Sequence, residues 1–362
     1  MNKYPPLEYS EYLQLEKILG SQSLRSEKLG TACHDEMLFI IVHQAYELWF
    51  KQVLTEIDSV LVLFNQSTVK DQDMGTIVAR LHRIIEIQGL LLQQIRVLET
   101  MTPLDFLEFR DFLYPASGFQ SVQNRLIENK LGLEQAKRLR FNQAPYEQHL
   151  PENSRKEIHA SETSPSLFTL VEKWLERTPF LKVGKFNFWD EYRKSVLHMF
   201  SQDQELINNN SQLSPQDRQR NLEELSNSIK TFDAIFEQAQ YENLRQTGQW
   251  RLSFNALHAA LFINIYRDQP ALQLPFRLLQ SLQDIDENFT TWRYKHALMA
   301  HRMLGRKIGT GGSSGHKYLE QATEKHKVFS DLFNLTTFFI PRSQRPHLPQ
   351  ELEKTLSYVY SV

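Results

Sequence analysis

A histidine in the stretch "WRYKHALMAHRMLG" (292–305) stands among side chains that suit a flat cofactor. Residues spaced three, four, three and four apart share one face of an α-helix, and here they are Phe289, Trp292, His296, Met299 and Met303. Imidazole is a common axial ligand of haem iron, and aromatic rings and thioethers suit the walls of a haem pocket. A core histidine with one hydrogen bond would give the same pattern, so both interpretations stay open.

A second histidine has a similar setting in "HDEMLFIIVHQAYELWFKQ" (34–52). The spacing places Phe39, His43, Tyr46 and Phe50 on one helical face. Two such histidines on different helices could hold one metallocofactor from opposite sides, or one could bind the metal while the other acts on a substrate. Ordinary core packing is again the alternative. We expect no zinc site, because His296 and His301 are five residues apart.

An arginine lies among aromatic residues in "MTPLDFLEFRDFLYPASGFQ" (101–120). The planar guanidinium of Arg110 needs an anionic partner, and it matches a carboxylate with two parallel hydrogen bonds. That partner is either a bound ligand or, in a purely structural role, Asp105 or Glu108. The following turn, "PASG", could bring Ser117 near the same pocket.

The glycine-rich stretch "GTGGSSG" (309–315) follows a predicted helix and lacks the lysine of a phosphate-binding loop. Its glycines would permit a mobile lid whose backbone N–H groups and Thr310 hydroxyl close on a small anionic ligand. A plain connector between helices is the alternative.

These candidate residues are expected to lie on helices. Helical periodicity predicts helices over residues 37–64, 76–99, 166–175, 217–236, 252–266, 275–304 and 314–333. Ser214 and Pro215 have the residue types of an N-cap and a first helical position. Only 13 glycines are present, four of them in 309–315, which leaves little turn material for a sheet. We therefore predict an all-α fold, a helical bundle around a pocket, with polar residues 142–166 as a linker or the start of a helical insertion.

Length and composition limit the number of domains, the cellular compartment and the kinds of partner that we expect. The 362 residues are expected to form a single helical domain, 1–362, with about 150–250 as a candidate helical insertion or subdomain. One cysteine, Cys33, and no secretory leader indicate a reducing, cytoplasmic compartment. The net charge of −2 argues against nucleic acid, and the longest apolar run, 37–42, is too short for a membrane span.

Together these blocks resemble the tryptophan 2,3-dioxygenase family of helical haem enzymes. The blocks "YSEYLQLEKIL", "HDEMLFIIVHQAYELWFKQ", "MTPLDFLEFRDFLYPASGFQS", "ERTPFL", "FNFW", "WRYKHALMAHRMLG", "GTGGSSG" and "DLFNLTTFFIPR" follow the family's order from about Tyr9 to Arg342. Their combination is far more specific than any one of them.

The resemblance implies a role for each candidate residue. His296 matches the axial ligand of one haem b per subunit, with Trp292, Ser117 and Gly118 beside that cofactor. His43 matches a distal catalytic histidine that hydrogen-bonds the indole N–H of L-tryptophan. Phe39 matches the aromatic residue packed on the indole, Arg110 the residue that clamps the carboxylate, and Thr310 the loop residue at the amino-acid end. The resemblance also implies a substrate contact for Ser117. Three further residues match those that reach into the pocket from a neighbouring subunit of a homotetramer: Tyr9, Tyr12 and Leu13.

The implied reaction is insertion of O2 into the indole C2–C3 bond to give N-formyl-L-kynurenine, the first step of tryptophan catabolism by the kynurenine pathway.

Two other classes of protein would explain some of these residues. A helical haem sensor would use His296 and His43 as two axial ligands, and a cofactor-free helical scaffold would need only the solvated helix faces. The sensor leaves Arg110 and the glycine-rich loop without a function.

Overall fold

The computed structural model describes residues 4–138, 150–305, 307, 321–323 and 325–358. Its long helices are α4 (Asp35–Phe64), α5 (Asp71–Leu98), α10 (Phe188–Asn209), α11 (Pro215–Phe236) and α14 (Gln273–Leu304). The helices of intermediate length are α7 (Val122–Leu131), α8 (Glu152–Thr163), α9 (Leu167–Glu176), α12 (Gln238–Gln246) and α13 (Phe254–Ile265). The all-α prediction is confirmed.

Short elements connect these helices. The short α-helices are α1 (Tyr9–Leu13), α2 (Leu15–Leu19), α3 (Arg25–Lys28), α6 (Pro103–Phe109), α16 (Ser330–Asn334) and α17 (Gln350–Leu356). The 3-10 turns are η1 (Arg110–Leu113), η2 (Gly118–Gln120), η3 (Gln135–Lys137), η5 (Pro270–Leu272), η6 (Leu335–Phe338) and η7 (Arg342–Gln344). One antiparallel hairpin, β1 (Lys182–Val183) with β2 (Phe186–Asn187), pairs Lys182 with Asn187.

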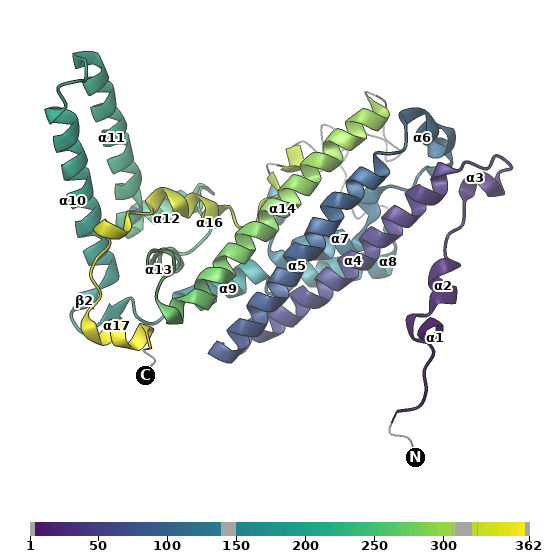
Figure 1. Cartoon of the computed structure of the whole chain (residues 1–362), viewed down its shortest axis with the longest axis horizontal. Coiled ribbons are helices and arrows are strands. Elements are labelled where there is room, and N and C mark those ends of the chain that lie inside the picture. The colour runs from purple at the N-terminus through teal and green to yellow at the C-terminus, as the bar shows by residue number, and fades with distance from the viewer. Residues whose placement is uncertain (1–3, 139–149, 306, 308–320, 324, 359–362) are drawn as a thin grey trace, which may run out of the picture.

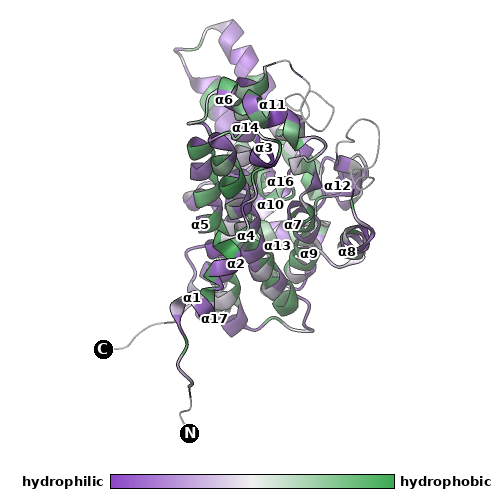
Figure 2. Cartoon of the chain, turned by 90° about the vertical axis from the view of Figure 1, so that its right-hand side faces the viewer, coloured by the Kyte–Doolittle hydropathy of each residue, from purple (hydrophilic) through white to green (hydrophobic). Residues whose placement is uncertain are grey.

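The frame of the molecule is three long helices, α4, α5 and α14, which lie side by side in Figure 1. Hydrophobic and hydrophilic residues alternate along them, as Figure 2 shows, so each can bury one side and leave the other in water. A single apolar cluster joins these helices to α9 and α13 and continues through Phe200 and Phe232 into the α10–α11 hairpin. No described helix combines the length and hydrophobicity that a membrane span requires.

The helix start predicted at Ser214 and Pro215 is confirmed, and its cause is visible. Ser214 caps α11 by accepting the N–H of Asp217 at 3.1 Å, and Pro215 is the first helical residue. His34 stands at the N-cap of α4. The polar stretch 142–166 contains α8, so its described part is helical rather than a linker.

The helix predicted over 314–333 is interrupted in its described part: residues 321–323 and 325 are helical, but the chain is not helical at 326–329 and α16 begins only at Ser330. The cause lies on α14. The Asp286 carboxylate accepts the N–H groups of Val328 and Phe329 at 2.9–3.1 Å, and Arg293 donates to the carbonyl of His326 at 3.1 Å. Side chains of another helix thus take the backbone groups that a continuous helix would pair internally.

Candidate functional site

A second, smaller apolar cluster lies where α4, the end of α5, α6 and α14 meet. Its buried members are Cys33, Val42, Ile95, Leu98, Met101, Phe109, Met299 and Met303, and its partly buried members include Phe39, Tyr46, Phe106 and Trp292. The aromatic and methionine faces predicted around His43 and His296 therefore meet in one place, from helices about 250 residues apart in sequence.

His296 is held in this cluster as a neutral imidazole. Burial, together with the charge of His43, lowers its pKa to about 4. The indole ring of Trp292 lies nearly parallel to it, with centroids 5.4 Å apart. Its Nδ1 atom is buried and has no hydrogen-bond partner among the described residues. A neutral imidazole that no protein group has already bound is what ligation of haem iron requires, so this residue fits the cofactor that the sequence predicts.

His43 lies on α4 close enough to His296 for its charge to lower that residue's pKa. Its ring is exposed to solvent, yet desolvation by the surrounding protein is the main cause that lowers its own pKa. Its Nδ1 lies 2.7 Å from the carbonyl oxygen of Phe39. Because a carbonyl only accepts, Nδ1 carries the hydrogen and Nε2 keeps a free lone pair in the neutral ring.

Phe39 lines the same region. Its ring centroid is 4.1 Å from that of His43, 5.8 Å from that of Phe106 and 5.6 Å from that of Phe109. These rings come from α4 and α6, and the start of α6 is fixed by a capping box between Thr102 and Asp105. The predicted aromatic wall is thus built by two helices.

Arg110 follows Phe109 at the junction of α6 and η1. Its side chain is largely covered, and Nη1 lies 3.3 Å from Oδ1 of Asp111, whose side chain is 86% exposed. An ion pair with so exposed a carboxylate contributes little to stability. Asp105, one of the two structural partners considered from the sequence, is bonded to Thr102.

The turn after η1 holds Ser117 and Gly118 at the start of η2. Ser117 is part of a capping box: its hydroxyl oxygen accepts the N–H of Phe119 at 3.4 Å, and its own N–H donates to Gln120 at 3.3 Å. A Cβ added to Gly118 would meet no atom within 4 Å. Thr310 and the rest of 309–315 lie outside the described residues.

The N-terminal residues do not reach this cluster within the chain. Tyr9 and Tyr12 are 74% and 71% exposed, and α1 has no buried residue. Figure 1 shows α1 and α2 on an arm that extends away from the bundle.

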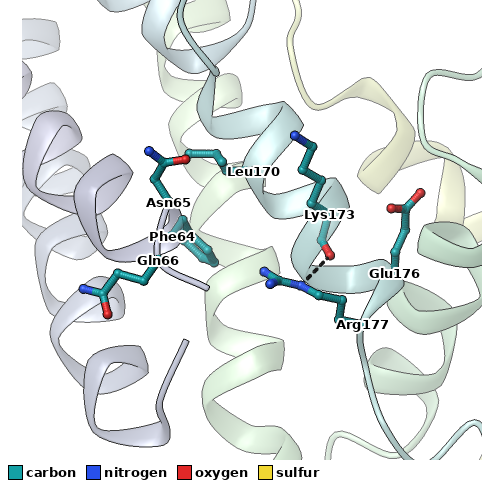
Figure 3. A pocket seen from close by; sticks show the side chains of 7 residues that line it. All are labelled: Phe64, Asn65, Gln66, Leu170, Lys173, Glu176 and Arg177. Atoms are coloured by element: carbon teal, nitrogen blue, oxygen red, sulfur yellow. Dashed lines mark hydrogen bonds between the residues drawn. The ribbon is translucent and has the colours of Figure 1, made fainter. Parts of the chain in front are cut away.

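A hollow of about 260 Å³ lies elsewhere, at the far end of α4, between Phe64 to Gln66 and helix α9 (Figure 3). In it Arg177 donates to the carbonyl of Lys173 and to that of Ser67. None of the residues singled out in the sequence lines it.

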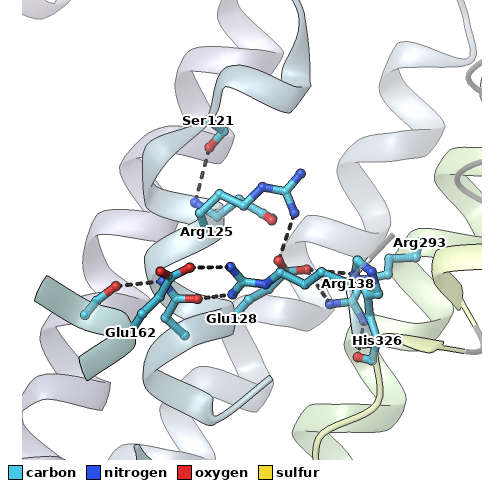
Figure 4. Close-up of polar contacts among 10 residues, drawn as sticks. Ser121, Arg125, Glu128, Arg138, Glu162, Arg293 and His326 are labelled. Carbon is cyan, nitrogen blue, oxygen red and sulfur yellow. Dashed lines mark hydrogen bonds and ion pairs between the residues drawn. The ribbon is translucent and has the colours of Figure 1, made fainter. Parts of the chain in front are cut away.

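Sequence reasoning missed a buried ionic network between α7, α14 and the segment at His326 (Figure 4). Glu128 on α7 accepts from Arg125 at 3.0 Å and Arg293 at 3.1 Å, and its Oε1 lies 3.3 Å from Nδ1 of His326. Although burial opposes ionisation, these partners hold the pKa of Glu128 well below its usual range. The available signal was Asp286 and Arg293, charged residues that interrupt the apolar stripe of α14.

Fold and site together define an all-helical protein in which His43 on α4 and His296 on α14 lie near one aromatic and methionine cluster, a set of residue types that fits a haem. Residues 3–339 match the model of the tryptophan 2,3-dioxygenase family. Similar proteins include the tryptophan 2,3-dioxygenases of Bdellovibrio bacteriovorus, 56% identical over 99% of this chain and 100% of the relative, and of Alteromonas mediterranea, 48% identical over 98% of each. That of Xenopus laevis is 46% identical over 96% of this chain and 86% of its own. The chain belongs to the tryptophan 2,3-dioxygenase family.

Proposed function

We propose that this chain binds one haem b per subunit through His296 and uses it to oxidise L-tryptophan in the cytoplasm. As a family member the chain is an oxidoreductase that inserts O2 into the indole C2–C3 bond to give N-formyl-L-kynurenine, the first step of the kynurenine pathway. The observation that carries the haem proposal is the neutral, half-buried His296, whose buried Nδ1 has no partner among the described residues.

Haem, when bound, supplies the activation of O2 that amino-acid side chains cannot provide. Trp292, Met299 and Met303 offer flat and polarizable surfaces around His296, and the small Gly118 and the hydroxyl of Ser117 lie in the turn assigned to the cofactor's other side. The protein's own task is to bind and orient the substrate.

His43 is proposed to align the substrate by accepting a hydrogen bond. Its Nδ1 hydrogen is engaged with the Phe39 carbonyl, so Nε2 presents a lone pair to the indole N–H. The lowered pKa keeps this nitrogen unprotonated near neutral pH. In the same state Nε2 can also take the indole proton during the reaction.

The remaining contacts fix the two ends of the amino acid. Phe39, backed by Phe106 and Phe109, offers a face for the indole and excludes water from it. Arg110 is proposed to clamp the carboxylate, because its guanidinium is largely covered at the end of this aromatic wall and its planar fork matches a carboxylate. Thr310 and Ser117 complete the amino-acid end, as the family resemblance implies.

The assembly we propose is a homotetramer in which Tyr9, Tyr12 and Leu13 complete a neighbouring subunit's pocket. The exposed aromatic residues of α1 support this, because a monomer gains nothing from leaving two tyrosines in water. We also propose that the chain is one domain with 150–250 as a helical insertion, since one apolar cluster runs from α4 into α11.

The visible spectrum of the purified protein tests the proposal. We expect a Soret band that shifts when L-tryptophan is added, turnover to N-formyl-L-kynurenine under O2, and loss of haem in His296→Ala. Full haem loading and normal turnover in His296→Ala would overturn the ligand assignment. A resting spectrum with two histidine ligands, unchanged by L-tryptophan, would instead support the haem-sensor alternative.

A further inference from the structure

The hydroxyl of Tyr46 ties together the three helices of the frame. From α4 it donates a hydrogen bond to the carbonyl of Leu91 on α5, at 2.6 Å. The indole N–H of Trp292 on α14 is hydrogen-bonded to the same hydroxyl, and the two ring centroids are 6.1 Å apart. The sequence shows only that Tyr46 shares a helical face with His43.

Each group in this chain of hydrogen bonds can take only one part, as donor or as acceptor, in each bond. An indole N–H only donates and a backbone carbonyl only accepts, so the order from Trp292 through Tyr46 to Leu91 is fixed. Burial, only partly offset by the Trp292 bond, raises the pKa of Tyr46 to about 12, which keeps the hydroxyl protonated as this order requires.

Trp292 is in turn the surface on which His296 rests. Its ring is tilted by 26° from the imidazole at a centroid distance of 5.4 Å, and Phe50 meets it edge-on at 6.3 Å and 84°. Because Nδ1 of His296 has no partner among the described residues, no hydrogen bond there fixes the rotation of the imidazole. Its orientation depends on the indole beside it.

We propose that Tyr46 is a positioning residue for the haem ligand: it holds the Trp292 ring against which the His296 imidazole stacks. This inference rests on the proposed role of His296. The Tyr46 hydroxyl touches neither substrate nor cofactor in this scheme and acts only through Trp292. A supported imidazole keeps its Nε2 lone pair aimed in one direction, which favours a stable bond to iron.

The test compares Tyr46→Phe with a matched control, Tyr192→Phe. Tyr192 likewise donates to a backbone carbonyl at 2.6 Å, that of Phe338, and stacks on a tryptophan, Trp189, but it is fully buried in the main core. We expect Tyr46→Phe to raise the rate of haem transfer to excess apomyoglobin about threefold to tenfold, the factor given by one hydrogen bond. The iron–histidine stretching band of the ferrous protein should shift with it. Tyr192→Phe should change neither.

A second variant, Trp292→Phe, keeps an aromatic ring but removes the indole N–H. If Tyr46 acts through Trp292, the haem-loss rates of Tyr46→Phe, Trp292→Phe and the double variant should be non-additive, with the double variant no worse than Trp292→Phe. Additive effects, or a Tyr46→Phe rate equal to that of Tyr192→Phe, would overturn the inference and leave the ligand assignment intact. Retention of the iron–histidine band in His296→Ala would instead contradict the proposed function itself.

Discussion

The chemical state of each histidine is set by its surroundings. His43, His258 and His296 all lie beside aromatic rings, and desolvation is the main cause that lowers the pKa of each. They differ in hydrogen bonding: His43 bonds a backbone carbonyl, whereas His258 and His296 each have a buried nitrogen without a partner among the described residues. One residue type can therefore align a substrate, bind iron or simply fill a core.

Arg110→Leu should weaken L-tryptophan far more than tryptamine, which lacks the carboxylate. Loss of one member of a desolvated charge pair costs about 2–5 kcal/mol, so kcat/KM for L-tryptophan should fall roughly 30-fold to several-thousand-fold, while the value for tryptamine changes little. Steady-state kinetics with both substrates measures this. Asp111→Asn is the control, because it removes the existing ion pair and should leave both substrates unaffected. Equal losses for both substrates in Arg110→Leu would make it a structural residue.

Protonation of His258 should make the free energy of unfolding sensitive to acid. Its ring is buried against Trp189 and Phe254, and burial, with the charge of Lys182, lowers its pKa to about 3. The unfolded chain, with an ordinary histidine pKa near 6.5, then binds the proton more readily, so stability falls as pH decreases from about 6.5 to about 3 and is unaffected above that window.

Urea unfolding of wild type and His258→Phe at pH 7 and pH 4.5 measures this contribution. Wild type should lose about 2–3 kcal/mol more than the variant between the two pH values, which is the linkage expected for two pH units. Parallel losses in both proteins would show that His258 is not the titrating group.

At the scale of elements, helices are placed by side chains that satisfy backbone groups of other segments. Two buried aspartates show this: Asp286 accepts the N–H groups of Val328 and Phe329, and Asp331 accepts those of Arg251 and Leu252, each at 2.7 Å. Asp286 lies within α14 and Asp331 in the first turn of α16, and the segments that they hold lie just before α16 and α13. Helix α14 therefore carries both His296 and Asp286, and Asp286 holds the chain at Val328 and Phe329.

Asp286→Ala should destabilise the fold markedly, because it leaves the N–H groups of Val328 and Phe329 buried without an acceptor. Each unsatisfied group costs about 1–3 kcal/mol, so the free energy of unfolding should drop by about 2–6 kcal/mol. Equilibrium denaturation checks this value. The exposed neighbour Glu287 supplies a control, because the free energy of unfolding of Glu287→Ala should stay within about 0.5 kcal/mol of the wild-type value. A small effect of Asp286→Ala would mean that water replaces the carboxylate.

At the scale of the whole molecule, the bundle and the N-terminal arm have different tasks. The bundle buries its own core, whereas α1 and α2 contain no buried residue and extend from α3 away from the frame (Figure 1). An arm of this kind gains its stability only from contact with another surface, as the proposed tetramer supplies.

A mixing experiment tests the arm. The double variant Tyr9→Ala/Tyr12→Ala should keep its haem and thermal stability, since neither side chain is buried in its own chain, but lose at least about tenfold in kcat/KM through the loss of two aromatic contacts. Co-expression with Arg110→Leu subunits should restore part of the activity, because some pockets then combine an intact arm with an intact Arg110. Absence of any restoration would indicate that the arm serves its own subunit or none.

Sequence alone determined the fold class, most helix positions and the two faces that carry the histidines. These features depend on local periodicity and capping, as at Ser214 and along 289–303, and local signals survive in a single chain. The family followed from the order of the blocks. The roles assigned to His43, Arg110 and Thr310 stay predictions until they are tested.

Which helix faces meet, and the chemical state of the groups on them, depends on contacts between elements far apart in the chain. The break at 326–329 depends on Asp286, some 40 residues earlier, and the hydroxyl of Tyr46 meets Trp292 across two helices. The Nδ1 hydrogen of His43 is assigned by a carbonyl one turn away, and the lowered pKa of His296 results from desolvation by the surrounding protein and from the charge of His43. Such contacts join residues far apart in sequence, and desolvation depends on everything packed around a group, so neither leaves a periodic signal in the chain.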